Sequence, residues 1–273
     1  MIFDIGGLTS DKQKKIAEGA LKYIAIKEAF AMSKENNLPL YKNVLFRKYF
    51  TDFYKLDSGS WKSATSQEIF YRLFEGIRVN FNDVGYNLAG ISNKNQALLT
   101  SAYSYIYNLL SYMSGYNEKS FSSKILHTLC NESPIIDSNI LGGFGMSEQE
   151  EKGTIFSIKA TAVYEKLFSF YYSTSRTEIT KTKKDKSKII VYKEDEGFIG
   201  HIQNKIGNFE GGIKAMCANI YSKSSKLQTA FSKDFKALGI NNATSELNKI
   251  SLVKIIDFYL WAKFSKYGDK END

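Results

Sequence analysis

The chain has 273 residues, of which 43% are hydrophobic and 24% charged, a balance typical of a globular protein rather than a disordered one. Lys and Arg outnumber Asp and Glu by 37 to 29, and the resulting net charge of +8 indicates an anionic partner such as nucleic acid. A lysine-rich source proteome would produce the same excess. The two cysteines, Cys130 and Cys217, lack a CxxC or Cys/His companion, which argues against a zinc site or a disulfide framework.

Cysteine usage favours a reduced, cytoplasmic setting. The first residues lack a basic-then-apolar signal pattern, and no apolar run approaches the roughly 20 residues needed to cross a bilayer. We therefore expect a cytoplasmic protein without a membrane partner.

Apolar residues at helical spacing dominate the sequence and predict a mostly α-helical fold. The expected helices cover residues 11–32, 40–56, 63–79, 95–113, a short segment after 117, 138–144 (helix or turn), 154–173, 213–222, 226–238 and 245–264, the last capped by Thr244 or Ser245. The Asn- and Gly-rich segment 80–95 is expected to be a loop, and 197–212 to be irregular. Without an internal repeat or composition break, we expect a single domain over 1–273, with two lobes, about 1–113 and 114–273, and a cleft between them as the alternative division.

Tyr103 and Tyr107 lie one helical turn apart in the segment 95–113. They either pack in the core or form an aromatic wall on which a nucleobase could stack.

The stretch 121–144 (FSSKILHTLCNESPIIDSNILGGF) organises the rest of the chain. It places Lys124 on a short helix, breaks at Pro134 and presents Asp137 thirteen positions after the lysine. One face of the helix is apolar, and the opposite polar face carries Lys124, His127 and Asn131. An ordinary solvated lysine is the alternative for Lys124, and a structural hydrogen-bonding residue is the alternative for His127.

A lysine and an aspartate that face one site could cleave an N-glycosidic bond. The carboxylate stabilises the positive charge that develops on the sugar as the base departs, or activates a water molecule. A neutral lysine amine can instead attack C1′ and form a Schiff base, and burial favours the neutral amine. The target base must first leave the stack and enter a pocket with aromatic walls.

The pattern Phe-x-Ser-Lys-x-Leu-His, followed by Pro-Ile-x-Asp-Ser, resembles the core of bacterial proteins with an 8-oxoguanine DNA glycosylase fold, distant relatives of the helix-hairpin-helix DNA glycosylase superfamily. The matching residues are Phe121, Ser123, Lys124, Leu126, His127, Pro134, Ile135, Asp137 and Ser138, with Asp257, Leu260 and Trp261 in the closing helix. The resemblance implies a glycosylase-like helical bundle in which Lys124 and Asp137 are catalytic. The residues expected to bind the substrate are Tyr103, Tyr107, His127, Ser138 and Phe144.

Residues 176–193 form a lysine-rich segment with interleaved β-branched residues, expected to be a small basic β-hairpin or loop insert. It is either solvated surface or an arm that contacts DNA phosphates. The expected contacts are Arg176, Lys181, Lys183, Lys184, Lys186 and Lys188. In the superfamily a glycine hairpin precedes the lysine, whereas this chain has only Gly115 there, and the basic arm could take over the grip on DNA.

These observations lead to one function and two alternatives. We expect a monomeric DNA glycosylase, without metal or cofactor, that flips a modified base from double-stranded DNA and leaves an abasic site. Modified phage DNA in antiviral defence is one substrate class to consider; which base is excised, and whether lyase chemistry follows, stays open. The alternatives are a non-catalytic helical nucleic-acid-binding protein and, ranked last, a nuclease that uses the cluster at 194–196.

Overall fold

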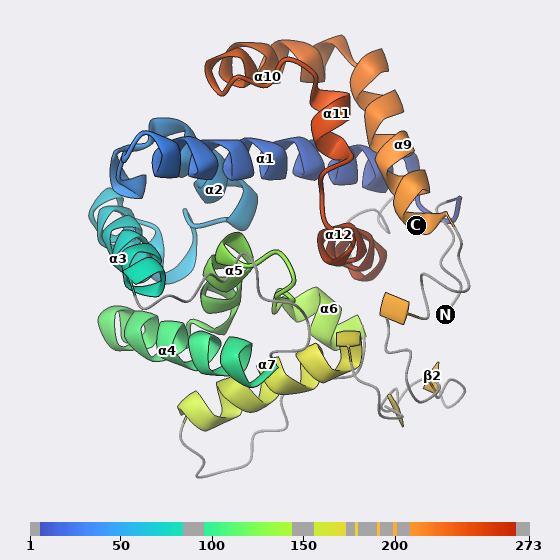
Figure 1. The fold of residues 1–273 in the computed structure, drawn as a ribbon. Helices are drawn as coiled ribbons and strands as arrows, with labels where there is room; N and C mark the ends of the chain where they lie inside the picture. Colours follow the sequence, from blue (N-terminus) through green and yellow to red (C-terminus); the bar gives the residue numbers. More distant parts are fainter. Residues whose placement is uncertain are drawn as a thin grey trace.

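The computed structural model describes residues 6–83, 96–143, 156–172, 178–179, 190–191, 199–200 and 208–265. Over these residues the fold is mostly α-helical, which confirms the predicted fold class (Figure 1). None of the helices in these ranges is long and apolar enough to span a membrane.

The first half of the chain forms four α-helices and two 3-10 turns. Their bounds are α1 (Ser10–Glu35), η1 (Leu40–Lys42), α2 (Val44–Tyr54), η2 (Gly59–Trp61), α3 (Ala64–Asp83) and α4 (Gln96–Ser114). The predicted helix over 40–56 is divided because Asn43 caps α2 by accepting a hydrogen bond from the backbone N–H of Phe46. Lys55, in the left-handed conformation with φ 58°, ends α2.

The second half adds six α-helices and a pair of two-residue strands to the described chain. Their bounds are α5 (Lys119–Leu129), α6 (Ser138–Gly143), α7 (Phe156–Tyr172), β1 (Glu178–Ile179), β2 (Ile190–Val191), α9 (Phe209–Lys223), α10 (Ser225–Ala237), α11 (Ala243–Leu247) and α12 (Leu252–Phe264). The strands pair antiparallel, with Glu178 opposite Val191, inside the segment where a hairpin was expected.

Two boundary predictions in this half were wrong. The segment 245–264 is not one helix, because Asn242 caps α11 and Ser251 caps α12 with side-chain hydrogen bonds, so neither Thr244 nor Ser245 serves as the cap. Helix α9 begins at Phe209, within the glycine-bearing segment that we expected to be irregular. Packing of Phe209 in the core and against Tyr259 offsets the low helix propensity of the glycines.

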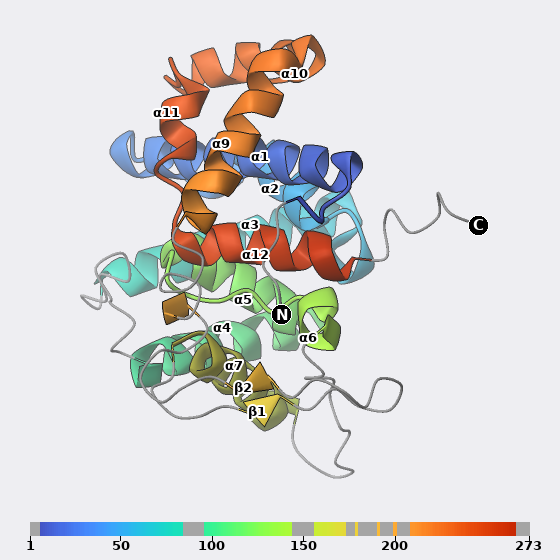
Figure 2. The same cartoon turned by 90° about the vertical axis from the view of Figure 1, so that its right-hand side faces the viewer.

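Helix α1 lies at the centre of the packing. It contacts α2 on one side and the C-terminal helices α9 to α12 on the other, whereas α4 packs on α5 and α7 (Figure 1). Helix α12 also contacts α6, and Figure 2 shows it between α1 above and α5 and α6 below. The two stretches that we considered as separate lobes thus share one connected set of buried residues.

Aromatic rings fill the core beneath α1, α2 and α3. Phe50 is fully buried, and its ring centroid lies 5.4 Å from that of Phe46, 5.5 Å from that of Phe74 and 4.7 Å from that of Tyr54. Tilted and edge-to-face pairs of this kind each contribute roughly 0.5–1.5 kcal/mol beyond the burial of their area. This packing holds Tyr54, the last residue of α2, in a fixed position beside α5.

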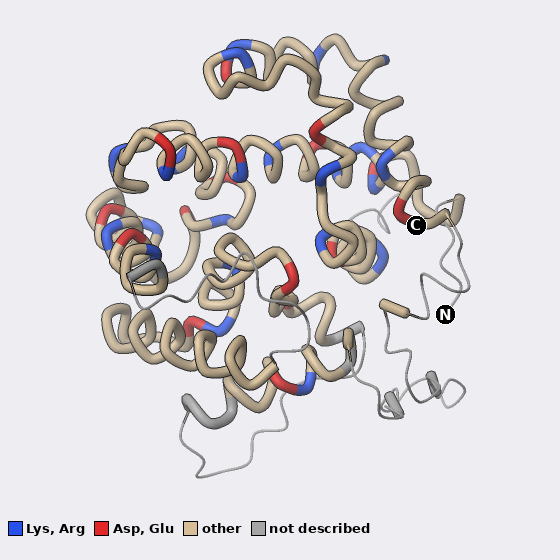
Figure 3. The backbone as a smooth tube through the Cα atoms, viewed as in Figure 1, with Lys and Arg blue, Asp and Glu red and all other residues tan. Residues whose placement is uncertain are grey.

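Charges of both signs are interspersed along α1, α2 and α3, whereas α4 carries no Lys, Arg, Asp or Glu (Figure 3). Interspersed charges partly cancel at a distance, which weakens the attraction of these helices for a polyanion. The lysine-rich segment 176–193 is therefore the stronger candidate for contact with phosphates.

Candidate active site

Lys124 lies on α5 with its ammonium against aromatic and backbone groups rather than in open solvent. Its Nζ donates a hydrogen bond to the backbone carbonyl of Tyr54 at 3.2 Å and lies 4.5 Å from the ring centroid of Phe121. Burial lowers the pKa of Lys124 to about 8, although the nearby carboxylate of Asp137 opposes this shift. A substantial fraction of this amine is therefore neutral near neutral pH, whereas a solvated lysine is almost entirely charged.

Asp137 caps the short helix α6. Its Oδ1 accepts hydrogen bonds from the backbone N–H groups of Asn139 at 2.8 Å and Ile140 at 3.4 Å. These bonds orient the carboxylate and satisfy two donors at the helix start. The Asp137 carboxylate raises the pKa of Lys124, so the fold places the two residues that the sequence predicted to act together within electrostatic reach of each other.

One hydrogen bond ties the Lys124 helix to the Asp137 loop. The hydroxyl of Ser123 accepts from the backbone N–H of Ile136 at 2.9 Å, and both groups are buried. Ser123 immediately precedes Lys124, and Ile136 immediately precedes Asp137. The bond therefore sets the separation of lysine and aspartate, which explains why a serine stands directly before the lysine.

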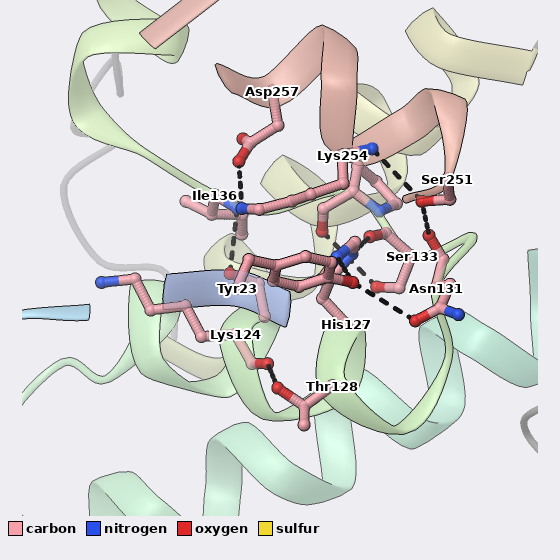
Figure 4. A network of polar contacts seen from close by, with 12 residues as sticks. Tyr23, Lys124, His127, Thr128, Asn131, Ser133, Ile136, Ser251, Lys254 and Asp257 are labelled. Atoms are coloured by element: carbon pink, nitrogen blue, oxygen red, sulfur yellow. Dashed lines mark hydrogen bonds and ion pairs between the residues drawn. The ribbon is translucent and has the colours of Figure 1, made fainter. Parts of the chain in front are cut away.

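A second lysine–aspartate pair lies on α12, next to the first. Lys254 and Asp257 are 1% and 7% exposed, and their side chains form an ion pair with Nζ 2.5 Å from Oδ2. Figure 4 shows Lys124 and His127 on α5 below Lys254 and Asp257 on α12. Burial raises the pKa of Asp257, while the Lys254 ammonium acts in the opposite direction.

Lys254 is the site residue that our sequence reasoning missed. The signal was a lysine and an aspartate three positions apart in the otherwise apolar run LVKIIDFYLW. Residues at this spacing face the same side of a helix, and charges within an apolar helix must find a partner when they are buried. We had noted Asp257 only as part of the resemblance.

His127 is fully buried in a polar network (Figure 4). Its Nε2 lies 3.0 Å from the hydroxyl of Tyr23, and its Nδ1 lies 2.7 Å from the backbone carbonyl of Ser133. The Ser133 hydroxyl extends the network to the hydroxyl of Tyr164 at 2.9 Å. Burial, reinforced by the Lys254 charge, lowers the pKa of His127 well below its ordinary value, so the ring is a neutral structural group.

Tyr103 and Tyr107 lie in the core. They are 0% and 2% exposed, and the ring of Tyr103 stacks on Tyr164 with centroids 4.3 Å apart and planes 7° apart. This is the core interpretation left open above, and a stacking wall for a base would require both rings to leave this packing. The same helix presents other tyrosines on the surface, Tyr105 at 46% and Tyr112 at 86% exposure.

The other residues expected to bind substrate or DNA are placed unevenly. Ser138 is exposed at the start of α6. Phe144 lies outside the described residues, as do the basic residues Arg176, Lys181, Lys183, Lys184, Lys186 and Lys188. The acidic cluster at 194–196 also lies outside them. Within the described ranges, no group of three or more His, Cys, Asp or Glu side chains is arranged to hold a metal ion.

Comparison of the chain with protein-family models, curated proteins and solved structures found no match. The glycosylase resemblance therefore rests on the residues of the organising stretch and the closing helix. The geometry around Lys124 is an independent observation, because it follows from packing and not from the motif.

Proposed function

We propose that this chain is a DNA glycosylase that uses Lys124 and Asp137 to remove a modified base from double-stranded DNA. One observation carries the proposal. The lysine of the motif lies in an environment that lowers its pKa to about 8, with the aspartate of the motif within electrostatic reach. A solvated surface lysine, the alternative for this residue, would keep the reference pKa of about 10.4.

The reaction follows from the two side chains. The neutral Lys124 amine attacks C1′ of the sugar, the N-glycosidic bond breaks, and the base departs with the bonding electrons and takes up a proton from solvent. Opening of the sugar ring then leaves a Schiff base between Lys124 and C1′. Asp137 stabilises the positive charge that develops on the sugar as the bond breaks.

Asp137 suits this role because it is oriented before any substrate arrives. Backbone N–H groups of α6 hold its Oδ1. Its position is tied to that of the nucleophile through the bond between Ser123 and Ile136. A preorganised carboxylate of this kind needs no rearrangement as charge appears on the sugar, which is the usual source of electrostatic stabilisation in enzymes.

The net charge of +8 supports DNA as the partner. Phosphate contacts release counterions, so binding to duplex DNA is expected to weaken steeply as salt concentration rises. Antiviral action on modified phage DNA belongs to the same proposal as one choice of substrate.

The test is a trapping and strand-scission assay on duplexes that each carry one modified base, from oxidised purines to phage-type modified cytosines. Borohydride reduces a Schiff base to a stable amine and so links protein to DNA. Wild type is expected to form this adduct on at least one duplex, Lys124→Gln to lose it, and Asp137→Asn to reduce base removal by about a hundredfold or more.

Lys27→Gln is the matched control. The pKa of Lys27 is also lowered to about 8 by burial, but its Nζ binds Asn131 at 2.7 Å, away from Asp137. The control should keep the adduct. If wild type produces no abasic site on any duplex yet still binds DNA in a salt-dependent way, the chain is a non-catalytic nucleic-acid-binding protein.

A further inference from the structure

Two lysine ammonium groups approach the same aromatic ring. Nζ of Lys124 lies 5.5 Å from the ring centroid of Tyr54, and Nζ of Lys254 lies 5.7 Å from it. Like charges at this separation repel each other strongly in a protein interior, where the effective dielectric constant is far below that of water. The pair is therefore most stable when only one of the two lysines is charged.

The two lysines are not equivalent as sites for that charge. Lys254 has the Asp257 carboxylate at 2.5 Å and four aromatic rings around its ammonium. The ring centroids of Tyr23, Phe53, Tyr54 and Phe258 lie between 4.8 and 5.7 Å from its Nζ. Ion pairing and cation–π contacts both stabilise the charged form. The positive charge thus belongs on Lys254.

We propose that the Lys254–Asp257 ion pair is a positioning unit that keeps the Lys124 amine uncharged and available for covalent attack. A neighbouring cation is one of the established ways in which proteins activate a lysine nucleophile. The inference rests on the proposed function for its biological meaning, but its test needs no DNA. Neither Lys254 nor Asp257 reacts in this scheme, because both act through Lys124.

Several charged groups face Lys124 from the surrounding elements. Asp137 at the start of α6, Asp257 on α12 and Glu118 before α5 raise its pKa, whereas burial and Lys254 lower it. Titratable tyrosines lie on α1, α2 and α7, and the hydroxyl of Tyr171 on α7 is close enough to Asp257 and Asp137 that both carboxylates raise its pKa. The two members of the ion pair therefore act on Lys124 in opposite directions, which provides a test that mere packing cannot imitate.

The experiment measures how fast Lys124 is acetylated by acetic anhydride across neutral to alkaline pH, with each lysine quantified by peptide mass spectrometry. Lys254→Met is expected to raise the apparent pKa of Lys124 by about one unit, which is about a tenfold loss of reactivity at neutral pH. Asp257→Asn is expected to lower that pKa and to increase reactivity. Lys254→Arg preserves the charge and is expected to keep the wild-type profile.

Lys27 is the internal reference in every sample. Its pKa is lowered by burial with no contribution from Lys254 or Asp257, so its profile should not change in any variant. If both Lys254→Met and Asp257→Asn move the Lys124 profile upward, or neither moves it, the pair is structural packing and the inference is overturned. If Lys254→Met does not fold, the direction of the shift in Asp257→Asn decides.

This result and the glycosylase assay fail in different ways. Opposite shifts without any DNA adduct would leave an activated lysine that serves another substrate. A DNA adduct without opposite shifts would leave a glycosylase whose lysine is activated by burial alone.

Discussion

The sharpest stability prediction concerns His127 and its dependence on pH. The ring is fully buried, with hydrogen-bonding partners at both nitrogens, and its pKa lies well below 6.5 in the folded state. An unfolded chain binds a proton at this histidine with a pKa near 6.5, whereas the folded chain does not. Between the folded and unfolded pKa values the unfolded state therefore holds more protons, and the free energy of unfolding must fall as pH falls.

The magnitude follows from the contacts. His127→Gln removes the titration and disturbs two buried hydrogen bonds, each with a net contribution of about 1 kcal/mol, so the variant should lose about 2 kcal/mol at pH above about 7. Below pH about 6.5 the wild type loses about 1.4 kcal/mol per pH unit at this site, while the variant does not. The difference between the two proteins should therefore shrink to near zero at pH about 5.

The assay is urea unfolding followed by tryptophan fluorescence, since Trp61 is buried. The comparison of variant with wild type matters, because Asp257 and Glu28 have raised pKa values and change stability in the opposite sense over acidic pH. His201→Gln reports the share of the only other histidine. A difference between His127→Gln and wild type that stays constant from neutral to acidic pH would refute the reasoning.

Two further predictions concern packing. Phe50→Ala should lower the free energy of unfolding by about 3–5 kcal/mol, because this ring is fully buried among other aromatic rings, whereas Val44→Ala, on the same helix and 75% exposed, should change it by less than about 0.5 kcal/mol. Equal losses in urea unfolding would show that the core is misassigned. Tyr164→Phe removes the hydrogen bond to Ser133 but keeps the ring stacked on Tyr103, so a loss of about 1 kcal/mol is expected, and a loss as large as that of Phe50→Ala would contradict it.

The closing helix α12 gives the fold a simple logic. It contacts α1 and α6, and it carries the ion pair that lies next to Lys124. The stretch that carries the motif and the last helix of the described chain are thus parts of one site, although well over a hundred residues separate them. Changes in the C-terminal helix should therefore affect the chemistry of Lys124 as well as stability.

Much of the fold and part of the site could be predicted from local pattern. Helical spacing identified most of the helices, because a 3.6-residue apolar period is a property of each segment by itself. The motif marked Lys124 and Asp137, and a helical wheel placed His127 on the polar face of its helix. Boundaries were less certain: Ser251 and Asn242 ended one expected helix and started two, because a cap depends on the geometry of its loop.

Tertiary structure decided what those residues experience. Burial and the neighbouring charges that lower the pKa of Lys124 to about 8 come from α2, α6 and α12, which the order of residues does not place beside α5. The same packing buries Tyr103 and Tyr107 and encloses Lys254 among four rings. A sequence specifies which side chains exist and which face of a helix they share. Solvation and the fields of distant charges arise only when separate segments meet, and for this protein they turn a lysine of the motif into a candidate nucleophile.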